Sequence, residues 1–520
     1  MQKRRFSIEN IFIAALMFFM AFQLSGQGVI NDGAKIKIEN GTTFVISDAT
    51  SGDLTNTGGI ISNYGDLLIE SDLVNNDTLI NGSDATGEGR IKIDGIVSGT
   101  GLSIAERYYA NQSNDGSKPD GRWWYITPGV EDAISDNILD ADFPRIWTFS
   151  ESSNVWNQIT TDISLTDLQG YATRVGSDQT VQYHGAAFFD GSLNYAITNS
   201  GNGWNLVGNP YPTTIDIDAV LERNSSLVFE TAWIRTNLQY ATWNSASDLG
   251  SNGGSQYVSK MQAFWVLCET AGSFSFEDSD KNTQTVSLLK STTYEDDATL
   301  RIVVSNNDIG DEAIFAVREG AAEYFESFDT QKKFGSANAE IYFELQSGEK
   351  LTANVVDILR DSSSYKLGIQ TREAGSFRFN FKSIEGFSEE IEIYLEDLEN
   401  GAFELVSEGM NYEFEIEETS NADRFRLSFF LKSVTSAYLS EALKSPRVSA
   451  NKQSIYIYTG DIGREQLNVT LYDLQGRQLQ RHILEGSDRY TLIADQLPGI
   501  YLVAFSAGEK HFTDKIVLSK

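Results

Sequence analysis

Short apolar runs separated by turn residues fill residues 28–104 of this 520-residue chain. The runs at 36–38, 67–69 and 91–93 are typical, and Gly, Asn, Asp and Ser are frequent between them. Runs this short with such frequent corners favour β-strands over helices. We expect the stacked coils of a short right-handed β-solenoid, and an ordinary β-meander is the alternative.

The length of this segment limits what a solenoid of this kind does. At about 20 residues per coil it holds about four coils. Strands stacked about 4.8 Å apart then make a rod on the order of 20 Å long. Catalytic β-helices need a longer groove, so we expect residues 27–104 to form a spacer, cap or stalk.

The first 26 residues have the pattern of an export signal. Basic residues at 3–5 precede an apolar run at 11–24, and small residues follow at 25–26. About 14 apolar residues are too few to span a bilayer core of roughly 30 Å. We therefore expect a signal peptide over 1–26 rather than a membrane anchor. No cysteine follows the run, which excludes a lipoprotein anchor, so the rest of the chain is expected outside the cytoplasm.

Cys268 is the only cysteine of the chain. An intramolecular disulfide and a cysteine metal cage are therefore excluded. An exported chain without disulfides needs large cores, which favours extended β-structure. Cys268 ends the apolar run 264–268 and is expected to be a buried structural residue rather than a nucleophile.

Two further modules and a linker are expected before the C-terminal segment. Residues 105–290 hold all eight tryptophans among strand-like runs and turns, which predicts a large β-sandwich. Residues 291–432 contain strictly alternating stretches at 390–393 and 412–417. Alternation places apolar side chains on one sheet face and carboxylates on the other, so a second sandwich is expected. Residues 433–450 are predicted to be a linker.

The last 70 residues carry a set of strand and turn motifs. A strand runs into a tight turn at 471–477, a turn feeds a strand at 497–503, and a final strand follows at 515–518. Gly476 is suited to a positive φ in the first turn. The segment 451–520 resembles the type A C-terminal sorting domain of the Bacteroidetes type IX secretion system. The residues that carry the resemblance are Tyr472, Asp473, Gly476, Arg477, Pro498, Gly499, Tyr501 and Lys515.

This resemblance implies a route and a set of partners. Such domains are small seven-stranded, Ig-like β-sandwiches that carry cargo across the outer membrane. The expected partner is the type IX machinery, and after tail cleavage the cargo is attached to surface lipopolysaccharide or released. The family often has Pro-Asn-Pro near the domain start, whereas this chain has Ser445-Pro446-Arg447, so the exact start is open.

The middle of the chain resembles segments common in large Bacteroidetes surface proteins with such tails. The resemblance rests on short stretches, and it implies no enzymatic role. The stretches are 122–126, 170–172, 189–194, 203–212, 215–216, 262–266, 328–329, 394–397, 412–414 and 424–425.

Charge and motif content exclude several classes of function. The formal net charge is −33, which repels nucleic acid and anionic lipid. Only residues 441–520 are balanced, with ten Lys or Arg against nine Asp or Glu. Nucleophile elbow, zincin and P-loop motifs do not occur in the sequence. We expect no enzyme, and a carboxylate-pair enzyme acting on polysaccharide remains the third alternative.

Two candidate sites stand out. Asp278, Asp280 and Asn282 have a D-x-D-x-N spacing that supplies oxygen ligands to Ca²⁺, although a polar turn is the simpler interpretation. Trp123, Trp124 and Trp243 have polar neighbours and are the best candidates for an exposed glycan platform, although core packing is the simpler role for tryptophan. No other cofactor is expected.

The sequence as a whole therefore predicts an all-β protein that is secreted or displayed on the cell surface. Its expected role is adhesion or surface structure, with an extracellular glycan or protein as a further partner. A carbohydrate-binding surface protein is the second alternative.

Overall fold

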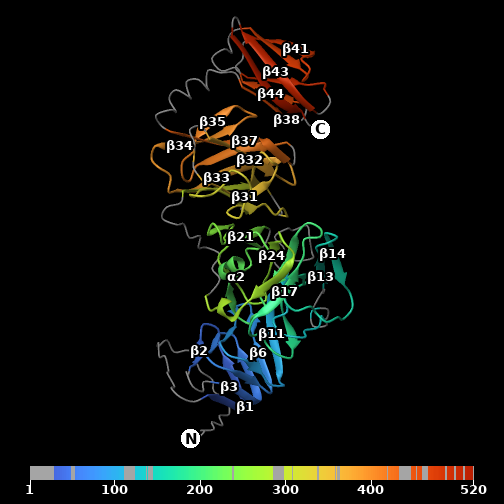
Figure 1. The fold of residues 1–520 in the computed structure, drawn as a ribbon, viewed down its shortest axis with the longest axis vertical. Coiled ribbons are helices and arrows are strands. Elements are labelled where there is room, and N and C mark those ends of the chain that lie inside the picture. The colour runs from blue at the N-terminus through green and yellow to red at the C-terminus, as the bar shows by residue number, and fades with distance from the viewer. Residues whose placement is uncertain are drawn as a thin grey trace. The chain divides into compact units, whose positions relative to one another are not determined.

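The computed structural model describes residues 28–518 apart from short internal gaps, and the predicted signal peptide lies outside the described residues. The chain divides into two compact units, 1–292 and 293–520. Strands dominate both units (Figure 1), so the all-β prediction is confirmed. The gaps are 48–52, 111–122, 136–137, 139–144, 237–238, 285–297, 307–308, 336–338, 358, 360–362, 418–419, 432–446, 452–453, 459–465, 486–488, 497–498 and 508–509.

Parallel strands open the first unit. They are β1 (Val29–Ile38), β2 (Thr43–Ile46), β3 (Leu54–Asn63), β4 (Asp66–Ile69), β5 (Leu73–Asn75), β6 (Thr78–Asn81), β9 (Arg90–Ile93), β10 (Val97–Ser98) and β11 (Leu102–Tyr109). One sheet pairs β1 with β3, β3 with β5 and β6, β5 with β10, and β6 with β11. A second sheet has the order β2-β4-β9. A β-meander has antiparallel neighbours, so it does not describe this part of the chain.

Buried asparagines run along this parallel stack in two rows. Asn31 donates from Nδ2 to Oδ1 of Asn56 at 2.9 Å, and Asn56 donates to Asn75 at 2.9 Å. Asn63 donates to Asn81 at 3.3 Å in the second row. All five side chains are at most 3% exposed. Each row joins successive strands through side-chain amides, which adds polar cohesion inside an otherwise apolar core.

The rest of the first unit consists of small sheets and one helix. The sheet orders are β12-β15-β13-β14, β18-β24-β20-β21-β22, β17-β25 and β23-β19-β26, and β16 pairs with β11. The elements are β12 (Trp124–Ile126), β13 (Arg145–Ser150), β14 (Val155–Ile159), β15 (Tyr171–Arg174), β16 (Gln179–Gly185), β17 (Leu193–Ile197), β18 (Trp204–Gly208), β19 (Thr214–Asp216), α2 (Ile217–Arg223), β20 (Thr231–Arg235), β21 (Tyr240–Asn244), β22 (Leu249–Ser251), β23 (Tyr257–Val258), β24 (Ala263–Leu267), β25 (Gly272–Phe276), η1 (Asp278–Asp280) and β26 (Lys281–Asn282). The hairpin β7 (Ser83–Asp84) and β8 (Gly87–Glu88) lies within the stack.

The predicted boundary at 104/105 falls inside β11. This strand pairs in parallel with β6 on one edge and antiparallel with β16 on the other. One core continues across the boundary, because buried residues of the stack such as Leu79 and Ile91 belong to the same cluster as Tyr109, Val181 and Met261. The stack and the following residues therefore form one unit.

The second unit begins with a large sheet over residues 298–431. Its order is β35-β34-β37-β32-β30-β31-β28-β27-β33-β36, and β29 pairs with β31. The strands are β27 (Ala298–Asn306), β28 (Ile309–Val317), β29 (Thr330–Gln331), β30 (Glu340–Glu344), β31 (Lys350–Val356), β32 (Ser363–Gln370), β33 (Gly375–Glu385), β34 (Ile391–Asp397), β35 (Ala402–Leu405), β36 (Asn411–Ile416) and β37 (Ser420–Leu431). Phe414 and Ile416 are buried while Glu413 and Glu415 are exposed, as the alternation predicts.

Seven strands in sheets of three and four end the described chain. They are β38 (Arg447–Asn451), β39 (Ser454–Tyr458), β40 (Leu467–Tyr472), β41 (Gln478–Leu484), β42 (Arg489–Ile493), β43 (Gly499–Ala507) and β44 (Lys510–Leu518). The first sheet begins at Arg447, four residues before the predicted domain start at 451. Most of the predicted linker, 433–446, lies outside the described residues.

Candidate functional site

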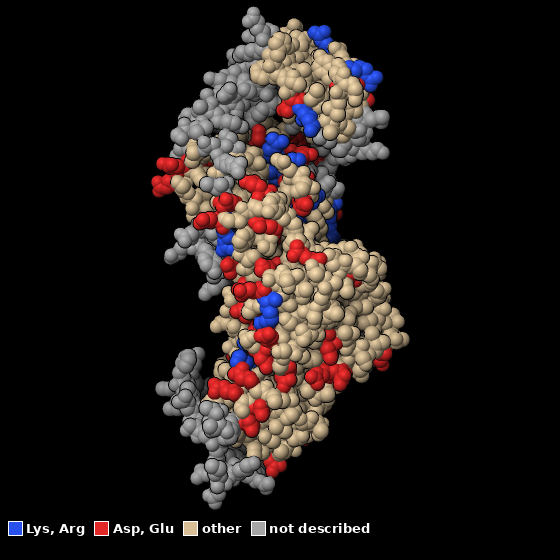
Figure 2. Space-filling model, in the orientation of Figure 1, with Lys and Arg blue, Asp and Glu red and all other residues tan. Residues whose placement is uncertain are grey.

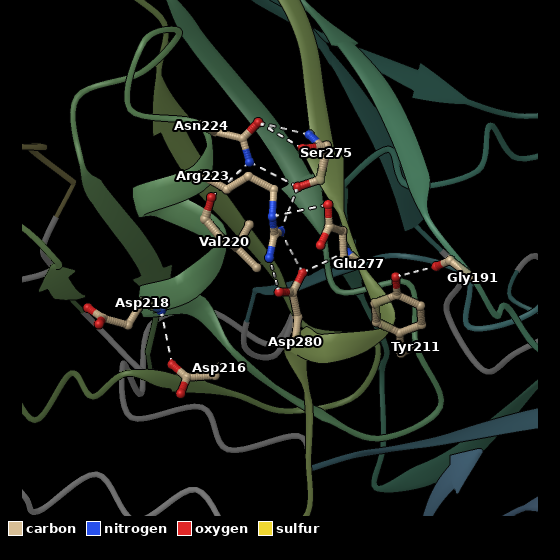
Figure 3. Close-up of polar contacts among 10 residues, drawn as sticks. All are labelled: Gly191, Tyr211, Asp216, Asp218, Val220, Arg223, Asn224, Ser275, Glu277 and Asp280. Atoms are coloured by element: carbon tan, nitrogen blue, oxygen red, sulfur yellow. Dashed lines mark hydrogen bonds and ion pairs between the residues drawn. The ribbon is translucent and has the colours of Figure 1, made fainter. Parts of the chain in front are cut away.

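The candidate calcium loop lies beside the C-terminal end of α2 (Figure 3). Asp216 caps the start of this helix, and its carboxylate accepts the backbone N–H of Asp218 at 3.2 Å. Arg223, in the last turn, donates from Nη1 to Oδ2 of Asp280 at 2.9 Å, and its Nη2 contacts Oδ1. Asp280 is fully buried and also accepts the backbone N–H of Glu277 at 2.8 Å. The arrangement is a charge-assisted clasp between a helix and a turn.

The other two candidate ligands are also committed to the chain itself. Asp278 accepts the backbone N–H of Gly191 at 2.9 Å and forms an ion pair with Lys281. Asn282 accepts the backbone N–H of Gln284 at 2.9 Å. Within the described residues, no group of three or more His, Cys, Asp or Glu side chains is placed to hold a metal ion. Cationic side chains and backbone amides therefore already engage Oδ1 of Asp278, both carboxylate oxygens of Asp280 and Oδ1 of Asn282.

Two buried lysines bind carbonyl oxygens at the ends of β6 and β9 in the parallel stack. Lys260 donates to the carbonyl oxygens of Asn81 at 3.1 Å and Gly82 at 2.7 Å. Lys281 donates to the carbonyl oxygen of Ile93 at 2.7 Å. Burial lowers the pKa of Lys260 to about 7. Sequence reasoning missed both residues, since a single lysine in a polar segment gives no signal that it reaches a strand end far along the chain.

The Asn-Pro-Tyr-Pro segment also contacts β6 and β9 of the stack. The carbonyl oxygen of Pro212 accepts the backbone N–H of Ile91 at 2.8 Å and Nδ2 of Asn81 at 2.7 Å. Tyr211 donates from its hydroxyl to the carbonyl oxygen of Gly191 at 2.7 Å (Figure 3). Asn209 donates to the carbonyl oxygens of Thr213, Val258 and Ser259. This segment, part of the stretch 203–212 that resembles other surface proteins, thus connects the parallel stack to later parts of the first unit.

Hydrogen bonds also join three residues of the second unit, one from each of the stretches 394–397, 412–414 and 424–425. Arg424 donates from Nε and Nη2 to the two carboxylate oxygens of Asp397, both at 2.9 Å. Tyr412 donates its hydroxyl to the same carboxylate at 2.9 Å. Asp397 is fully buried and Arg424 is 7% exposed. These side chains hold β34, β36 and β37 together.

The three tryptophans of the predicted glycan platform differ in their exposure. Trp243 is 2% exposed, and its indole N–H donates to the carboxylate of Asp218 at 2.9 Å, so the prediction that Trp243 is exposed is wrong. Trp123 is half-buried against Trp147, with ring centroids 4.9 Å apart. Trp124 is half-buried edge-on to Tyr109 at 5.7 Å.

The most exposed tryptophan in the described residues is one that the sequence did not single out. Trp156 on the edge strand β14 is 38% exposed. Its ring lies 5.8 Å from that of Tyr125 with a tilt of 32°, and edge-on contacts to Phe149 and Trp265 support it. The polar residues Ser152, Ser153 and Asn154 before this strand were the available signal of exposure.

Cys268 is buried, as predicted, in the core that includes Phe264 and Val266. Burial raises the pKa of its thiol to about 11. A thiol in this state is a poor nucleophile at neutral pH.

The turn of the C-terminal motif follows β40, which ends at Tyr472. Asp473 accepts the backbone N–H groups of Gln475 at 3.1 Å and Arg477 at 2.8 Å, and its other oxygen accepts Nε of Arg477 at 3.0 Å. These hydrogen bonds, that of the Arg477 backbone foremost, lower the pKa of Asp473. Gly476 has a φ of 78°, the positive value that the turn predicts.

The remaining motif residues lie on the last two strands or outside the described part. Gly499 and Tyr501 belong to β43, and Lys515 is exposed on β44. Pro498 lies outside the described residues. Figure 2 shows Lys and Arg side chains together with carboxylates on this C-terminal domain, and many carboxylates with fewer Lys and Arg over the rest of the visible face. The C-terminal sheets thus match the expected domain in strand number and in charge.

Residues 144–429, more than half of the chain, match a family described as a domain of unknown function (DUF8693). The chain belongs to this family. Residues 451–519 match the secretion system C-terminal sorting domain. The chain is therefore a type IX-sorted, secreted cell-surface protein of the Bacteroidetes, and the type IX machinery is its partner during export.

No curated protein matches the chain. Two solved structures align with it at low similarity. One, titled "Biofilm associated protein - BSP domain", is 7% identical with a TM-score of 0.18 over 80% of this chain and 96% of that one. The other, the Bacillus anthracis TIE protein, is 11% identical with a TM-score of 0.09 over 80% of this chain and 71% of that one. Scores this low carry no argument about fold or function.

The DUF8693 region, residues 144–429, extends from just before β13 through most of β37, so it includes parts of both units. The junction residues Asn209, Tyr211 and Pro212 and the cluster of Asp397, Tyr412 and Arg424 lie inside it. The parallel stack and the sorting domain lie outside. Among the described residues, no helix is long and apolar enough to cross a membrane.

Proposed function

We propose that this DUF8693 protein has an adhesive or structural role at the cell surface, without a catalytic one. The observation that carries the proposal is the combination of a surface-sorting domain with ionisable groups committed to the fold. Asp280 is clasped by Arg223, Asp397 by Arg424, and Asp311 by Lys332. Side chains locked in this way keep β-sheets in register outside the cell, where no disulfide is available to this chain.

We also propose that the parallel stack is a short right-handed solenoid that serves as a spacer or cap, and that the later sheets pack as sandwiches. The parallel registers and the asparagine rows support the first part. Lys260, Lys281 and the carbonyl oxygen of Pro212 satisfy groups on the last coil, as the end of a stack requires.

A bead assay tests the adhesive role. The chain without residues 1–26 is coupled to beads through its C-terminus, and the beads are mixed with cells of the producing strain or with each other. Beads coated with a charge-matched carrier protein are the control. Binding to cells, or clustering of the beads, above the level of these control beads supports adhesion. Beads that neither bind nor cluster contradict it and leave a purely architectural role.

Carbohydrate binding is the second candidate, and the position of Trp156 favours it. An aromatic ring supported from behind and open to solvent stacks on the apolar face of a pyranose ring. Trp156 meets this description through its contacts with Tyr125 and Phe149. A glycan array with and without Ca²⁺ tests it, with Trp156→Ala as the loss variant. Tyr324→Ala, at an aromatic side chain that is 70% exposed in the other unit, is the control.

A further inference from the structure

β1 is the terminal strand of the larger parallel sheet. It pairs with β3 from Val29↔Leu54 to Ile38↔Asn63, and no other strand in the described part of the chain pairs with it. Figure 1 shows β1 at the end of the stack away from β11. Its second edge therefore presents backbone N–H and C=O groups along ten residues, which is a template for another strand.

The side chains of β1 change their alternation at a local irregularity. The register with β3 shifts between Asn31 and Ala34, where Gly33 has a φ of 93°. Before the shift, Val29 and Asn31 face the core of the stack, and after it Ile36 and Ile38 do. The outward positions are exposed, and they are Ile30, Asp32, Lys35 and Lys37.

This change makes the strand complementary to itself. We propose that two copies of the chain pair through β1, antiparallel about a two-fold axis between Gly33 and Ala34. Full-length pairing then sets Val29 opposite Ile38 and Asn31 opposite Ile36. These pairs lie on the core side of both strands. The remaining pairs, Ile30 with Lys37 and Asp32 with Lys35, lie on the outer side.

Charge and side-chain alternation together select this register. Asp32 of each copy lies opposite Lys35 of the other, so two opposite-charge pairs form across the axis. Neither Asp32 nor Lys35 has an ion-pair partner among the described residues, whereas Lys37 is paired with Glu39 at 2.9 Å. A slip of two residues one way sets Asp32 opposite Gly33 and loses both pairs. A slip the other way sets Asp32 opposite Lys37, which Glu39 already neutralises. It also sets the inward Ala34 opposite the outward Lys35, so side-chain alternation disfavours this register.

A second copy fits this edge better than an unrelated strand does. Lysines and irregularities on an edge strand discourage pairing with arbitrary partners. Here the same features match only a strand that carries Asp and Lys in mirrored positions, and β1 itself is such a strand. The pairing also covers Ile30, which is 38% exposed. A symmetric two-fold contact is the commonest mode of self-association.

This inference deepens the proposed adhesive role, since self-pairing on neighbouring cells is one way to adhere, but its test is independent of adhesion. The chain without residues 1–26 is studied by sedimentation velocity over a range of concentrations. The variants are Asp32→Lys, Lys35→Asp and the double variant. Asp162→Lys, an exposed position in the loop after β14, gives the same charge change elsewhere.

Each single variant should weaken dimerisation by at least about tenfold, because two attractive pairs become two repulsive ones. The double variant should restore it, and so should an equimolar mixture of the two single variants, whose strands are complementary again. Asp162→Lys should dimerise as the original chain does. Recovery in the mixture shows that the single variants are folded.

A chain that is monomeric at all concentrations overturns the proposal. Dimers that the single variants leave unchanged overturn it as well. A dimer that responds as expected while coated beads fail to adhere keeps the pairing and contradicts only the adhesive role.

Discussion

Arg424 and Asp397 form a buried bidentate ion pair, with Nε and Nη2 each 2.9 Å from a carboxylate oxygen. The pair joins β34 to β37, and Tyr412 adds a hydrogen bond from β36. Removing one member of such a pair leaves the other charge buried without compensation. Replacing one carboxylate oxygen of Asp397 is therefore expected to destabilise the second unit.

Asp397→Asn should lower the free energy of unfolding of the second unit by about 3–5 kcal/mol. Urea denaturation followed by hydrogen exchange in β34 and β37 measures this and assigns the transition to that unit. Lys366→Ala is the matched control. It removes an exposed ion pair with Asp423 at 2.8 Å, and its effect should stay within about 1 kcal/mol. Equal effects of the two substitutions would contradict the structural role of the buried pair.

Glu151 should make the first unit sensitive to acid. Burial by itself would raise its pKa, but hydrogen bonds from the backbone of Gly203 and Gly201 and the hydroxyls of Ser200 and Thr198 hold it at about 2. The folded pKa is below the unfolded one, so this stabilisation is present above about pH 4.5 and is lost as the pH falls towards 2.

Glu151→Gln should therefore lose about 2–3 kcal/mol of stability at pH 7. The difference from the original chain should shrink between pH 4.5 and pH 2. Thermal unfolding of both chains across this range is the measurement. A difference that does not change with pH would show that the carboxylate charge is not what holds the 198–203 loop.

The asparagine row predicts a position-specific loss of stability in the stack. Asn56→Ala removes the acceptor for Asn31 and the donor to Asn75, so each of these buried amides loses one hydrogen bond. Asn31 keeps its contacts with Ala34, and Asn75 keeps its bond to the carbonyl oxygen of Leu102. The expected cost is about 2–4 kcal/mol. Asn76→Ala is the control, because Asn76 is exposed and accepts only the backbone N–H of Thr100 at 3.2 Å. Hydrogen exchange in β3 and β5 should increase for the first variant alone.

Local patterns predicted the strands well and long-range contacts poorly. Alternation in 412–417 identified Phe414 and Ile416 as buried, because successive side chains of a strand point to opposite faces of the sheet. The asparagine row was not foreseen, since Asn31, Asn56 and Asn75 are separated by unequal stretches of chain. The sequence alone does not distinguish them from turn residues, because the register between β1, β3 and β5 is what brings them together.

The candidate sites show the same limit. The polar neighbours of Trp243 suggested exposure, but the partner of its indole, Asp218, lies in a helix that precedes it by 25 residues. The spacing of Asp278 and Asp280 suggested Ca²⁺ binding. In the structure, Arg223 pairs with Asp280 and Lys281 pairs with Asp278. Sequence spacing identifies which oxygens are near each other, but it does not identify what occupies them.

The most direct test of an adhesive role after export by the sorting domain is to measure surface display and cell attachment in the same set of strains. The set consists of the parent strain, a strain lacking the gene, and a strain whose chain ends before Arg447. We expect the truncated chain to stay in the periplasm and both altered strains to attach equally poorly to cells and surfaces. Unchanged attachment without the gene would contradict the adhesive role, and display of the truncated chain would contradict the assigned function of the sorting domain.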